Sequence, residues 1–419
     1  MTAPQKRNFW LYAIGRLVSL IGSGIQAVAL PLYILDKTGS GSMMGIFAML
    51  SMVPALMITP LAGVIGDRWD RKRIMVNLDY ARGLIILILA FLTLTNKLNI
   101  PILFITQIFV SLMDSIFGSA TAAMLPDLLS VEKLKWGNSI MATIRSLSGI
   151  IGPALGGIIY GILGIEWVFI INGVSFILSA VSEMFIKYTV PHDRDKKFNL
   201  KIFIEDTKEG LKFIWGKKTL LSLLMLFMVL NFLANPIFIV ALPYVFREVI
   251  GFSAQQFGYA QTFWTIGTLL GSIMVGTFLI KISTSKLFKI GLLAMVYIAI
   301  IFSFEFFPVF QNIFGGPTWG YFLLIAISLL IMGIFNMILN IPIDTYLQKM
   351  TPSDIRARVF SVIGLLAQLA VPVGSLIFGL LLDRFPAHSV MMAISILLAL
   401  ISTAYILRGP KEILVEEEI

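Results

Sequence analysis

Three charged side chains stand inside long apolar stretches of the sequence, where an ionisable group is costly and usually has a function. Arg16 lies about two helical turns into the first stretch, Asp114 near the middle of the fourth, and Arg145 about two turns into the fifth. Asp114 could bind and release a proton, because burial and neighbouring charges change the proton affinity of a carboxyl group. It could equally form a structural ion pair with Arg145 or Arg16. The sequence leaves both interpretations open.

The residue types needed for catalysis are scarce. The chain has no cysteine and two histidines, and both histidines fall in predicted loops. A thiolate or imidazole metal site and a nucleophile–base pair are therefore not expected. The sequence also lacks a glycine-rich phosphate loop ending in Gly-Lys-Ser or Gly-Lys-Thr. We expect no metal, no cofactor and no enzyme activity; a lipid-modifying membrane enzyme would need a catalytic cluster that the sequence does not show.

The composition indicates the environment that surrounds these charges. The chain has 419 residues, of which 58% are hydrophobic and 13% are charged, and its mean hydropathy is +0.91. A water-soluble protein of this length could not hide so much apolar surface. A lipid bilayer removes the difficulty, since a helix of about 20 apolar residues crosses its hydrocarbon core. We therefore predict an all-α integral membrane protein.

Twelve apolar stretches are long enough to cross a membrane as helices. A short basic N-terminus precedes the first of them, which we interpret as an uncleaved span rather than a signal peptide. The predicted spans are Phe9–Leu35, Met43–Gly66, Ile74–Thr95, Pro101–Pro126, Asn138–Leu163, Trp167–Lys187, Thr219–Phe246, Gln255–Ile280, Leu287–Phe307, Trp319–Tyr346, Val359–Asp383 and Ser389–Leu407.

The basic residues test this count, because Lys and Arg gather on the cytoplasmic side of membrane proteins. If both termini are cytoplasmic, only four of the 32 Lys and Arg residues fall in outer loops, namely Lys37, Lys97, Arg247 and Arg384. Three more lie within spans, and all the others fall on the inner side. This alternation supports twelve spans with cytoplasmic termini. The net charge of +9 then indicates contact with anionic lipid and gives no reason to expect nucleic acid.

A polar, basic segment divides the spans into two groups of six. We predict an N-terminal bundle over residues 1–187, a cytoplasmic connector over 188–218 and a C-terminal bundle over 219–419. Within the connector, apolar residues recur at helical spacing over Lys201–Trp215, which predicts a short amphipathic helix at the membrane surface or packed as a linker. The fifth and eleventh spans each carry a mid-helix proline after a polar turn, Pro153 and Pro372, which indicates a repeat of six helices.

The loop after the second span carries a dense group of charges, Gly-Val-Ile-Gly-Asp-Arg-Trp-Asp-Arg-Lys-Arg over residues 63–73. Glycine permits close approach of helices, aspartate can accept hydrogen bonds at a helix N-terminus, and arginines suit carboxylate partners. The simpler interpretation is a set of positive charges that anchors the loop in the cytoplasm. We expect Asp79 and Arg82, a little further along, to lie near the cytoplasm and bridge to this loop.

This loop resembles the signature loop of the major facilitator superfamily, whose members are membrane transporters with two six-helix bundles. The resemblance implies a cytoplasmic latch between the two halves, received near residues 355–358 at the start of the eleventh span. The residues that match the signature are Gly63, Asp67, Arg68, Arg71 and Lys72.

The fifth span adds Gly152, Pro153, Gly156 and Gly157, which resemble the glycine-proline signature of exporting members of the superfamily. A hinge and plain packing both suit these residues and Pro372, because glycine admits a neighbouring helix and proline bends its own. The stretches 204–214 and 357–361 are similar to the subgroup that contains bacterial macrolide efflux proteins. The resemblance implies an exporter in the bacterial cytoplasmic (inner) membrane.

Uncharged polar residues within the spans indicate the kind of cargo. In the resembling family spans one, four, seven and ten line the central cavity, and an apolar surface with scattered amides suits a bulky amphipathic compound. We expect a proton-coupled exporter of lipophilic molecules, of macrolide or multidrug type, that works by alternating access as a monomer among membrane lipids. The alternative is an exporter or flippase of a lysolipid, a siderophore or another metabolite. The expected cavity amides are Gln26, Asn231, Asn235, Asn336 and Asn340.

Overall fold

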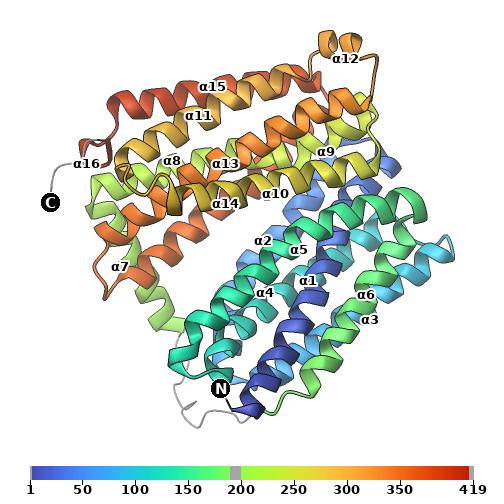
Figure 1. The fold of residues 1–419 in the computed structure, drawn as a ribbon, viewed down its shortest axis with the longest axis vertical. Coiled ribbons are helices and arrows are strands. Elements are labelled where there is room, and N and C mark those ends of the chain that lie inside the picture. The colour runs from blue at the N-terminus through green and yellow to red at the C-terminus, as the bar shows by residue number, and fades with distance from the viewer. Residues whose placement is uncertain (1, 189–199, 415–419) are drawn as a thin grey trace. The chain divides into compact units, whose positions relative to one another are not determined.

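A computed structural model describes residues 2–188 and 200–414, apart from the side chains of residues 64, 67, 68, 200–204, 206 and 411. All regular secondary structure in these ranges is helical (Figure 1). The first sequence half forms α1 (Ala3–Thr38), α2 (Gly41–Arg68), α3 (Arg71–Leu94), α4 (Ile100–Leu128), the 3-10 turn η1 (Val131–Lys133), α5 (Leu134–Leu163) and α6 (Ile165–Met184).

The second half begins with α7 (Leu200–Gly216), which follows the part of the predicted connector that lies outside the described residues. The remaining elements are α8 (Lys218–Pro236), the π-helical turn η2 (Ile237–Ala241), α9 (Leu242–Tyr244), the π-helical turn η3 (Val245–Ile250), α10 (Ala254–Thr277), α11 (Thr284–Phe304), α12 (Pro308–Phe314), α13 (Trp319–Met350), α14 (Arg356–Leu382), α15 (Ala387–Arg408) and α16 (Lys411–Leu414).

Polar side chains fix where several of these helices begin. The first backbone N–H groups of a helix have no partner within it, so a preceding Asp, Asn, Ser or Thr side chain can accept from them. Asp70 accepts from the N–H of Arg73 at 3.2 Å before α3, and Asn99 accepts from that of Ile102 at 2.9 Å before α4. Ser283 caps α11 in the same way. These caps set the registers of the helices that carry the charged residues.

Eleven helical segments in the described ranges are long and apolar enough to cross a membrane. They confirm the prediction of an all-helical membrane protein. The predicted eighth span, Gln255–Ile280, forms α10, but this helix is not among the eleven. Twelve spans and cytoplasmic termini therefore stay predictions.

The chain folds into two compact units. The first comprises Met1–Lys37, Leu50–Phe198 and Ser253–Thr262, and the second comprises Thr38–Met49, Asn199–Phe252 and Phe263–Ile419. Each unit thus takes a short piece from the other sequence half: the start of α2 belongs to the second unit, and the start of α10 belongs to the first.

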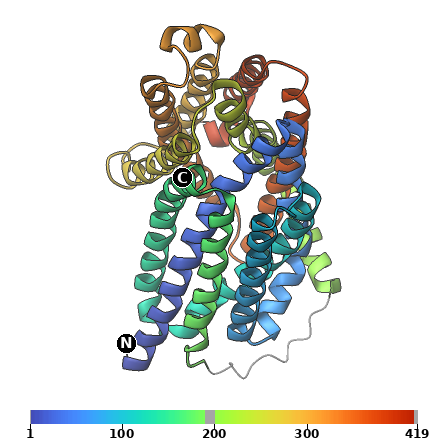
Figure 2. The same cartoon turned by 90° about the vertical axis from the view of Figure 1, so that its right-hand side faces the viewer.

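Small residues bring the helices of the first unit together. α1, α5 and α6 run side by side (Figure 2), and α3 packs along α6. A Cβ atom at Gly24 of α1 would lie 3.1 Å from the Cα atom of Gly152 in α5. A Cβ atom at Gly83 of α3 would lie 3.0 Å from the carbonyl oxygen of Gly173 in α6. In lipid the hydrophobic effect does not drive helices together, so the van der Waals contacts that such close approach allows are a main source of helix association.

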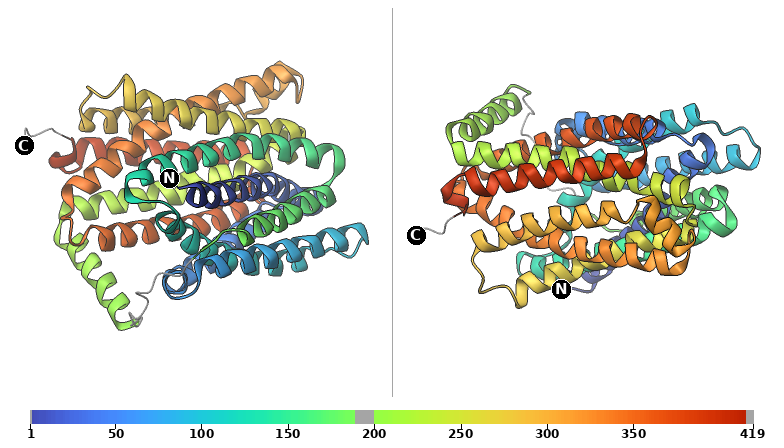
Figure 3. Two further views of the ribbon diagram at one scale, coloured as in Figure 1. Left: turned by 60° about the horizontal axis from the view of Figure 1, so that its bottom comes forward. Right: turned by 90° about the horizontal axis from the view of Figure 1, so that it is seen from above.

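In the second unit, α11 packs against both α13 and α15, and α8 packs against α14 (Figure 3). The helix α7 lies against the start of α14, where Arg358 donates to Glu209 at 2.6 Å and the side chain of Ile214 is fully buried. The part of the connector that the structure describes is therefore a packed helix, although Trp215 at its end is exposed.

The start of α2 is tied to the end of α14 within the second unit. Asp383 accepts hydrogen bonds from the N–H of Gly41 at 2.6 Å, the N–H of Ser42 at 3.0 Å and the hydroxyl of Ser40 at 2.9 Å. A carboxylate from one sequence half therefore satisfies the N-terminal amides of a helix from the other half. A Cβ atom at Gly45 would lie 2.6 Å from the carbonyl oxygen of Ser375, so the helices also touch one turn further on.

Candidate functional site

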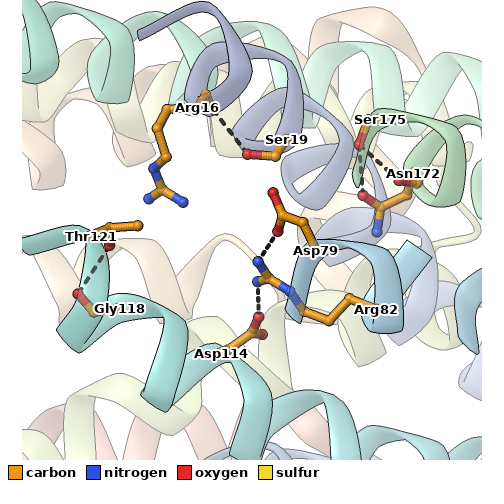
Figure 4. Close-up of polar contacts among 9 residues, drawn as sticks. All are labelled: Arg16, Ser19, Asp79, Arg82, Asp114, Gly118, Thr121, Asn172 and Ser175. Atoms are coloured by element: carbon orange, nitrogen blue, oxygen red, sulfur yellow. Dashed lines mark hydrogen bonds and ion pairs between the residues drawn. The ribbon is translucent and has the colours of Figure 1, made fainter. Parts of the chain in front are cut away.

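A cluster of charged side chains lies between helices of the first unit. The Arg82 guanidinium of α3 donates to Asp79 of the same helix and to Asp114 of α4 (Figure 4). Asp79 is fully buried and Arg82 is 4% exposed, whereas the side chain of Asp114 is 51% exposed. Arg82 thus joins a buried carboxylate to an accessible one.

Aromatic rings hold the two arginines of this cluster. The Arg82 guanidinium lies 4.0 Å from the centre of the Phe117 ring and 4.5 Å from that of Phe176. Arg16 of α1 lies 5.0 Å from the centre of the same Phe117 ring. A cation over an aromatic face is attracted electrostatically, and more strongly where water is excluded. Phe117 therefore stabilises two positive charges in an apolar interior.

A further acid, Glu183 of α6, completes the cluster. It is 1% exposed, and neither carboxylate oxygen has a hydrogen-bond partner in the described structure. Its surroundings include Asp79 and Arg82 of α3 and Tyr12 and Arg16 of α1. The hydroxyl of Ser179 lies between Asp79 and Glu183 without making a well-aligned hydrogen bond to either.

The pairing of Asp114 differs from the sequence expectation. The structure joins Asp114 to Arg82, and it forms no ion pair with Arg145 or Arg16 among the described residues. Arg145 is exposed on α5, and Arg16 rests on Phe117. The expected bridge from Asp79 and Arg82 to the charged loop stays a prediction: Arg82 donates to Asp79 and to Asp114 of α4, and the side chains of residues 67 and 68 lie outside the described residues. The i, i+3 spacing of Asp79 and Arg82 was the sequence signal for their pairing.

The charged loop makes its contacts within the first unit. Arg71 donates to the Asp127 carboxylate at 2.6 Å and to the carbonyl oxygens of Gly66 at 3.1 Å and Ala123 at 3.2 Å. Tyr188 donates to the same carboxylate at 2.7 Å. The side chains of Asp67 and Arg68 lie outside the described residues, and Lys72 is half-buried.

Gly63 differs from the expectation of a close helix contact, since a Cβ atom there would meet none of the described atoms of other residues within 4 Å. The nearest contact of this kind in the loop is at Gly66, beside Ala120 of α4. Arg71 therefore joins the loop to α4, and the latch between the two halves stays a proposal.

The glycines of α5 lie at close helix contacts. A Cβ atom at Gly152 would lie 2.9 Å from the Cα atom of Gly24, and one at Gly156 would lie 2.6 Å from the carbonyl oxygen of Ile25. A Cβ atom at Gly157 would lie 2.4 Å from the carbonyl oxygen of Ala254 in α10. α5 thus packs against α1 on one side and the start of α10 on the other. Pro153 and Pro372 are both buried within long helices, α5 and α14.

The amides predicted to line a cavity divide into two kinds. Gln26 is buried and accepts a hydrogen bond from Asn172 of α6 at 2.7 Å, so it belongs to a contact between helices. The other four are partly exposed and bond along their own helices. In α8, Asn235 donates to Asn231 at 2.6 Å, and in α13 Asn340 donates to the carbonyl oxygen of Asn336 at 2.8 Å.

Long apolar helices, charges buried between them and helices packed through glycine are the features of a polytopic membrane protein. The family model of the Major Facilitator Superfamily matches residues 12–374 and 224–417. The chain therefore belongs to this superfamily, which confirms the resemblance of the loop signature. It is a multi-pass transporter of the bacterial cytoplasmic membrane and not an enzyme.

Relatives of the chain include two efflux proteins. Macrolide efflux protein A of Streptococcus pyogenes is 25% identical over 397 residues, which cover 90% of each chain. The multidrug efflux pump Tap of Mycolicibacterium fortuitum is 25% identical over 411 residues, which cover 94% of each chain.

Solved transporter structures share the fold. A bacterial homologue of the iron transporter ferroportin, in an inward-facing state, has a TM-score of 0.74 and 15% identity and covers 95% of this chain and 98% of its own. The nucleoside transporter NupG has a TM-score of 0.71 and 16% identity, with 95% and 98% of the two chains covered. At this identity the likeness concerns the fold alone.

Proposed function

We propose that the protein is a secondary active exporter, which moves bulky lipophilic or amphipathic molecules out of the cell while protons move in. The observation that carries the proposal is the buried charge cluster around Arg82, within a chain whose curated relatives are efflux proteins. The two halves would alternate between states open to either side.

The charge cluster supports a proton as the coupling ion. Ionisable groups inside a membrane protein are costly and mark ion pathways and proton relays. Here an accessible acid, Asp114, is linked through Arg82 to the buried Asp79. A change in the protonation of one acid therefore alters the charge balance that Arg82 must satisfy at the other. The sequence has no nucleotide-binding loop that would supply a different energy source.

Features of the second unit support the proposed substrate class. Asn231 and Asn235 of α8 and Asn336 and Asn340 of α13 place amides on otherwise apolar helices. The rings of Phe238 and Trp264 contact each other at a tilt of 46°, with ring centres 4.3 Å apart. A binding surface that is mostly apolar, with a few amides and aromatic rings, suits a large compound with scattered polar groups. The relatives named for macrolide efflux and multidrug efflux agree with this class.

Inverted membrane vesicles test the proposal, because uptake into them equals export from the cell. We expect vesicles that contain the protein to accumulate ethidium or erythromycin when energised, and to lose that accumulation when a protonophore collapses the gradient. Vesicles from cells without the protein are the control. Accumulation at an unchanged rate after collapse would refute proton coupling. Failure to move either compound would shift the substrate class to lysolipids, siderophores or other metabolites, which form the next panel.

A further inference from the structure

Glu183 has an environment that no pairing in the cluster explains. It is 1% exposed, both of its oxygens lack a hydrogen bond, and the described structure gives it no ion-pair partner. The charged and titratable groups that face it are Tyr12 and Arg16 from α1 and Asp79 and Arg82 from α3. An ionised carboxylate in this environment has an unfavourable desolvation free energy that no partner offsets, whereas the neutral acid has a much smaller one.

The neighbouring acid increases that cost. Asp79 forms an ion pair with Arg82 through its Oδ1 atom. The other carboxylate oxygen of Asp79, Oδ2, is buried without a hydrogen-bond partner in the described structure. The hydroxyl of Ser179 lies between Asp79 and Glu183 and can donate to only one of them at a time. Two carboxylates that share a dry site do not both ionise readily, because like charges repel where little solvent screens them. One of the pair therefore holds a proton when Arg82 is committed to the other.

We propose that Glu183, paired with Asp79, is the residue that holds the coupling proton, and that Asp114 is the accessible acid through which the pair communicates with water. The inference rests on the proposed proton-coupled export and assigns its proton site. Asp114 differs from Glu183 in that half of its side chain is exposed to solvent and it forms an ion pair with Arg82.

Arg82 provides the link between the two acids. In the described arrangement it donates to Asp79 and Asp114 together. When a proton binds to the Asp114 carboxylate, that carboxylate becomes neutral and no longer attracts the Arg82 guanidinium strongly. Arg82 can then form ion pairs with the buried acids, Asp79 and Glu183. Glu183 then releases its proton to water and becomes a carboxylate beside Arg82 and Arg16. In the return step Glu183 takes up a proton and Asp114 releases its own, so each acid binds one proton and releases one in each cycle.

The site suits a proton better than a metal cation. Metal binding needs several oxygen ligands, and the described residues contain no group of three or more acids, cysteines or histidines that could hold a metal. The Arg82 guanidinium also occupies the place beside Asp79 that a cation would need. Dependence of transport on sodium in place of the pH gradient is therefore an outcome that would overturn the proposal.

The first experiment compares Glu183→Gln with wild type in vesicles. Glutamine has the shape of the neutral acid but cannot exchange a proton. We expect gradient-driven accumulation of ethidium to fall to the level of vesicles without the protein, while counterflow exchange of ethidium, which needs no net proton movement, is retained. The matched control is Glu305→Gln, at a buried glutamate that accepts from Ser328 at 2.5 Å in the second unit; it should accumulate ethidium as wild type does.

A second measurement does not depend on transport. Glu305 is also buried with an unpaired oxygen, so the infrared spectra are compared in the Glu305→Gln background. At neutral pH the purified Glu305→Gln protein should show the band of a buried carboxylic acid, and adding Glu183→Gln should remove it. Absence of that band in Glu305→Gln, or its persistence in the double variant, would overturn the assignment of the proton. If Glu183→Gln fails to fold, Glu183→Asp keeps the acid and should retain part of the gradient-driven accumulation.

The two proposals fail differently. If wild type shows no gradient-driven uptake of any probe, the proposed coupling is wrong. If the gradient drives equal uptake in wild type and in Glu183→Gln, the proposed proton coupling is supported and the assignment of the proton to Glu183 is wrong. If Asp114→Asn loses gradient-driven accumulation of ethidium while Glu183→Gln keeps all of it, the proton site is Asp114 and not Glu183.

Discussion

Arg82 is the residue on which the charges of the first unit converge. It contacts a buried carboxylate, an accessible carboxylate and two aromatic rings. Its Nε is buried without a partner, as is Oδ2 of Asp79. Buried polar networks with unpaired members are costly, and they persist where a change of partner is part of the function. The cluster thus has the chemistry of a switch as well as of an ion pair.

The burial of the two acids predicts different costs for removing them. Asp79→Asn leaves Arg82 with one partner, which is exposed, and we expect a loss of about 3–5 kcal/mol of stability, as for a broken buried ion pair. Asp114→Asn removes a half-exposed partner, and we expect a loss of at most about 1 kcal/mol. Thermal unfolding of the purified variants in one detergent measures both. Equal, small losses would mean that Glu183 replaces Asp79 as the counter-ion.

The sequence identified the charged residues but not all of their partners. Asp114 and Arg16 stood out because their neighbours along the chain are apolar. The contact between Arg82 and Asp114 depends on how α3 and α4 are rotated about their axes, which a single sequence does not determine. From the sequence, Glu183 is an acid near the inner surface with no role, because it lies one residue before the end of α6, where an acid is usually solvated. Only the packing of α1, α3 and α6 around it excludes water.

At the scale of elements, the apolar periodicity located the long helices and missed their irregularities. The predicted span Thr219–Phe246 is interrupted by the π-helical turns η2 and η3, which follow Pro236 and Pro243. Proline lacks a backbone N–H and crowds the preceding turn, so the hydrogen-bond ladder shifts register there. The short helix α12 was also not predicted, because seven residues carry too little periodicity to detect.

The glycines of α5 allow a direct test of helix packing. We expect Gly156→Ala to cost about 1–3 kcal/mol, because the new methyl group would lie 2.6 Å from the carbonyl oxygen of Ile25 in α1. Gly118→Ala in α4 is the matched control: no atom lies within 4 Å of its Cβ position, so the change should be neutral or stabilise by up to about 1 kcal/mol. Thermal unfolding again provides the measurement. Equal shifts for the two variants would show that α1 and α5 do not meet at Gly156.

At the scale of the whole molecule, contacts between the sequence halves decide how a transporter of this kind can move. The start of α2 is held to the end of α14 by the three hydrogen bonds that Asp383 accepts. The start of α10 is held to α5, where a Cβ atom at Gly258 would lie 2.4 Å from the carbonyl oxygen of Pro153. By the predicted topology both contacts lie toward the outer face. Alternating access requires contacts at this face to open once in each cycle.

A cysteine pair tests whether the contact between α2 and α14 opens. The chain has no cysteine, so Gly41→Cys together with Leu382→Cys introduces the only thiols. A Cβ atom at Gly41 would lie 3.0 Å from the Cβ atom of Leu382, within about half an ångström of the range for a disulfide. We expect oxidation to cross-link the pair and stop ethidium uptake, and a reductant to restore it.

The single variants, Gly41→Cys and Leu382→Cys, control for effects of the oxidant and of the new side chains, and both should transport equally before and after oxidation. A cross-linked double variant that still accumulates ethidium at the rate of its reduced form would show that α2 and α14 stay together throughout the cycle. The opening would then have to be sought at α5 and α10, where Gly157 and Gly258 bring two backbones together. If transport stops only in the cross-linked double variant, the contact that opens is the one at Asp383. A carboxylate suits a contact that opens, because water can replace the hydrogen bonds that it accepts.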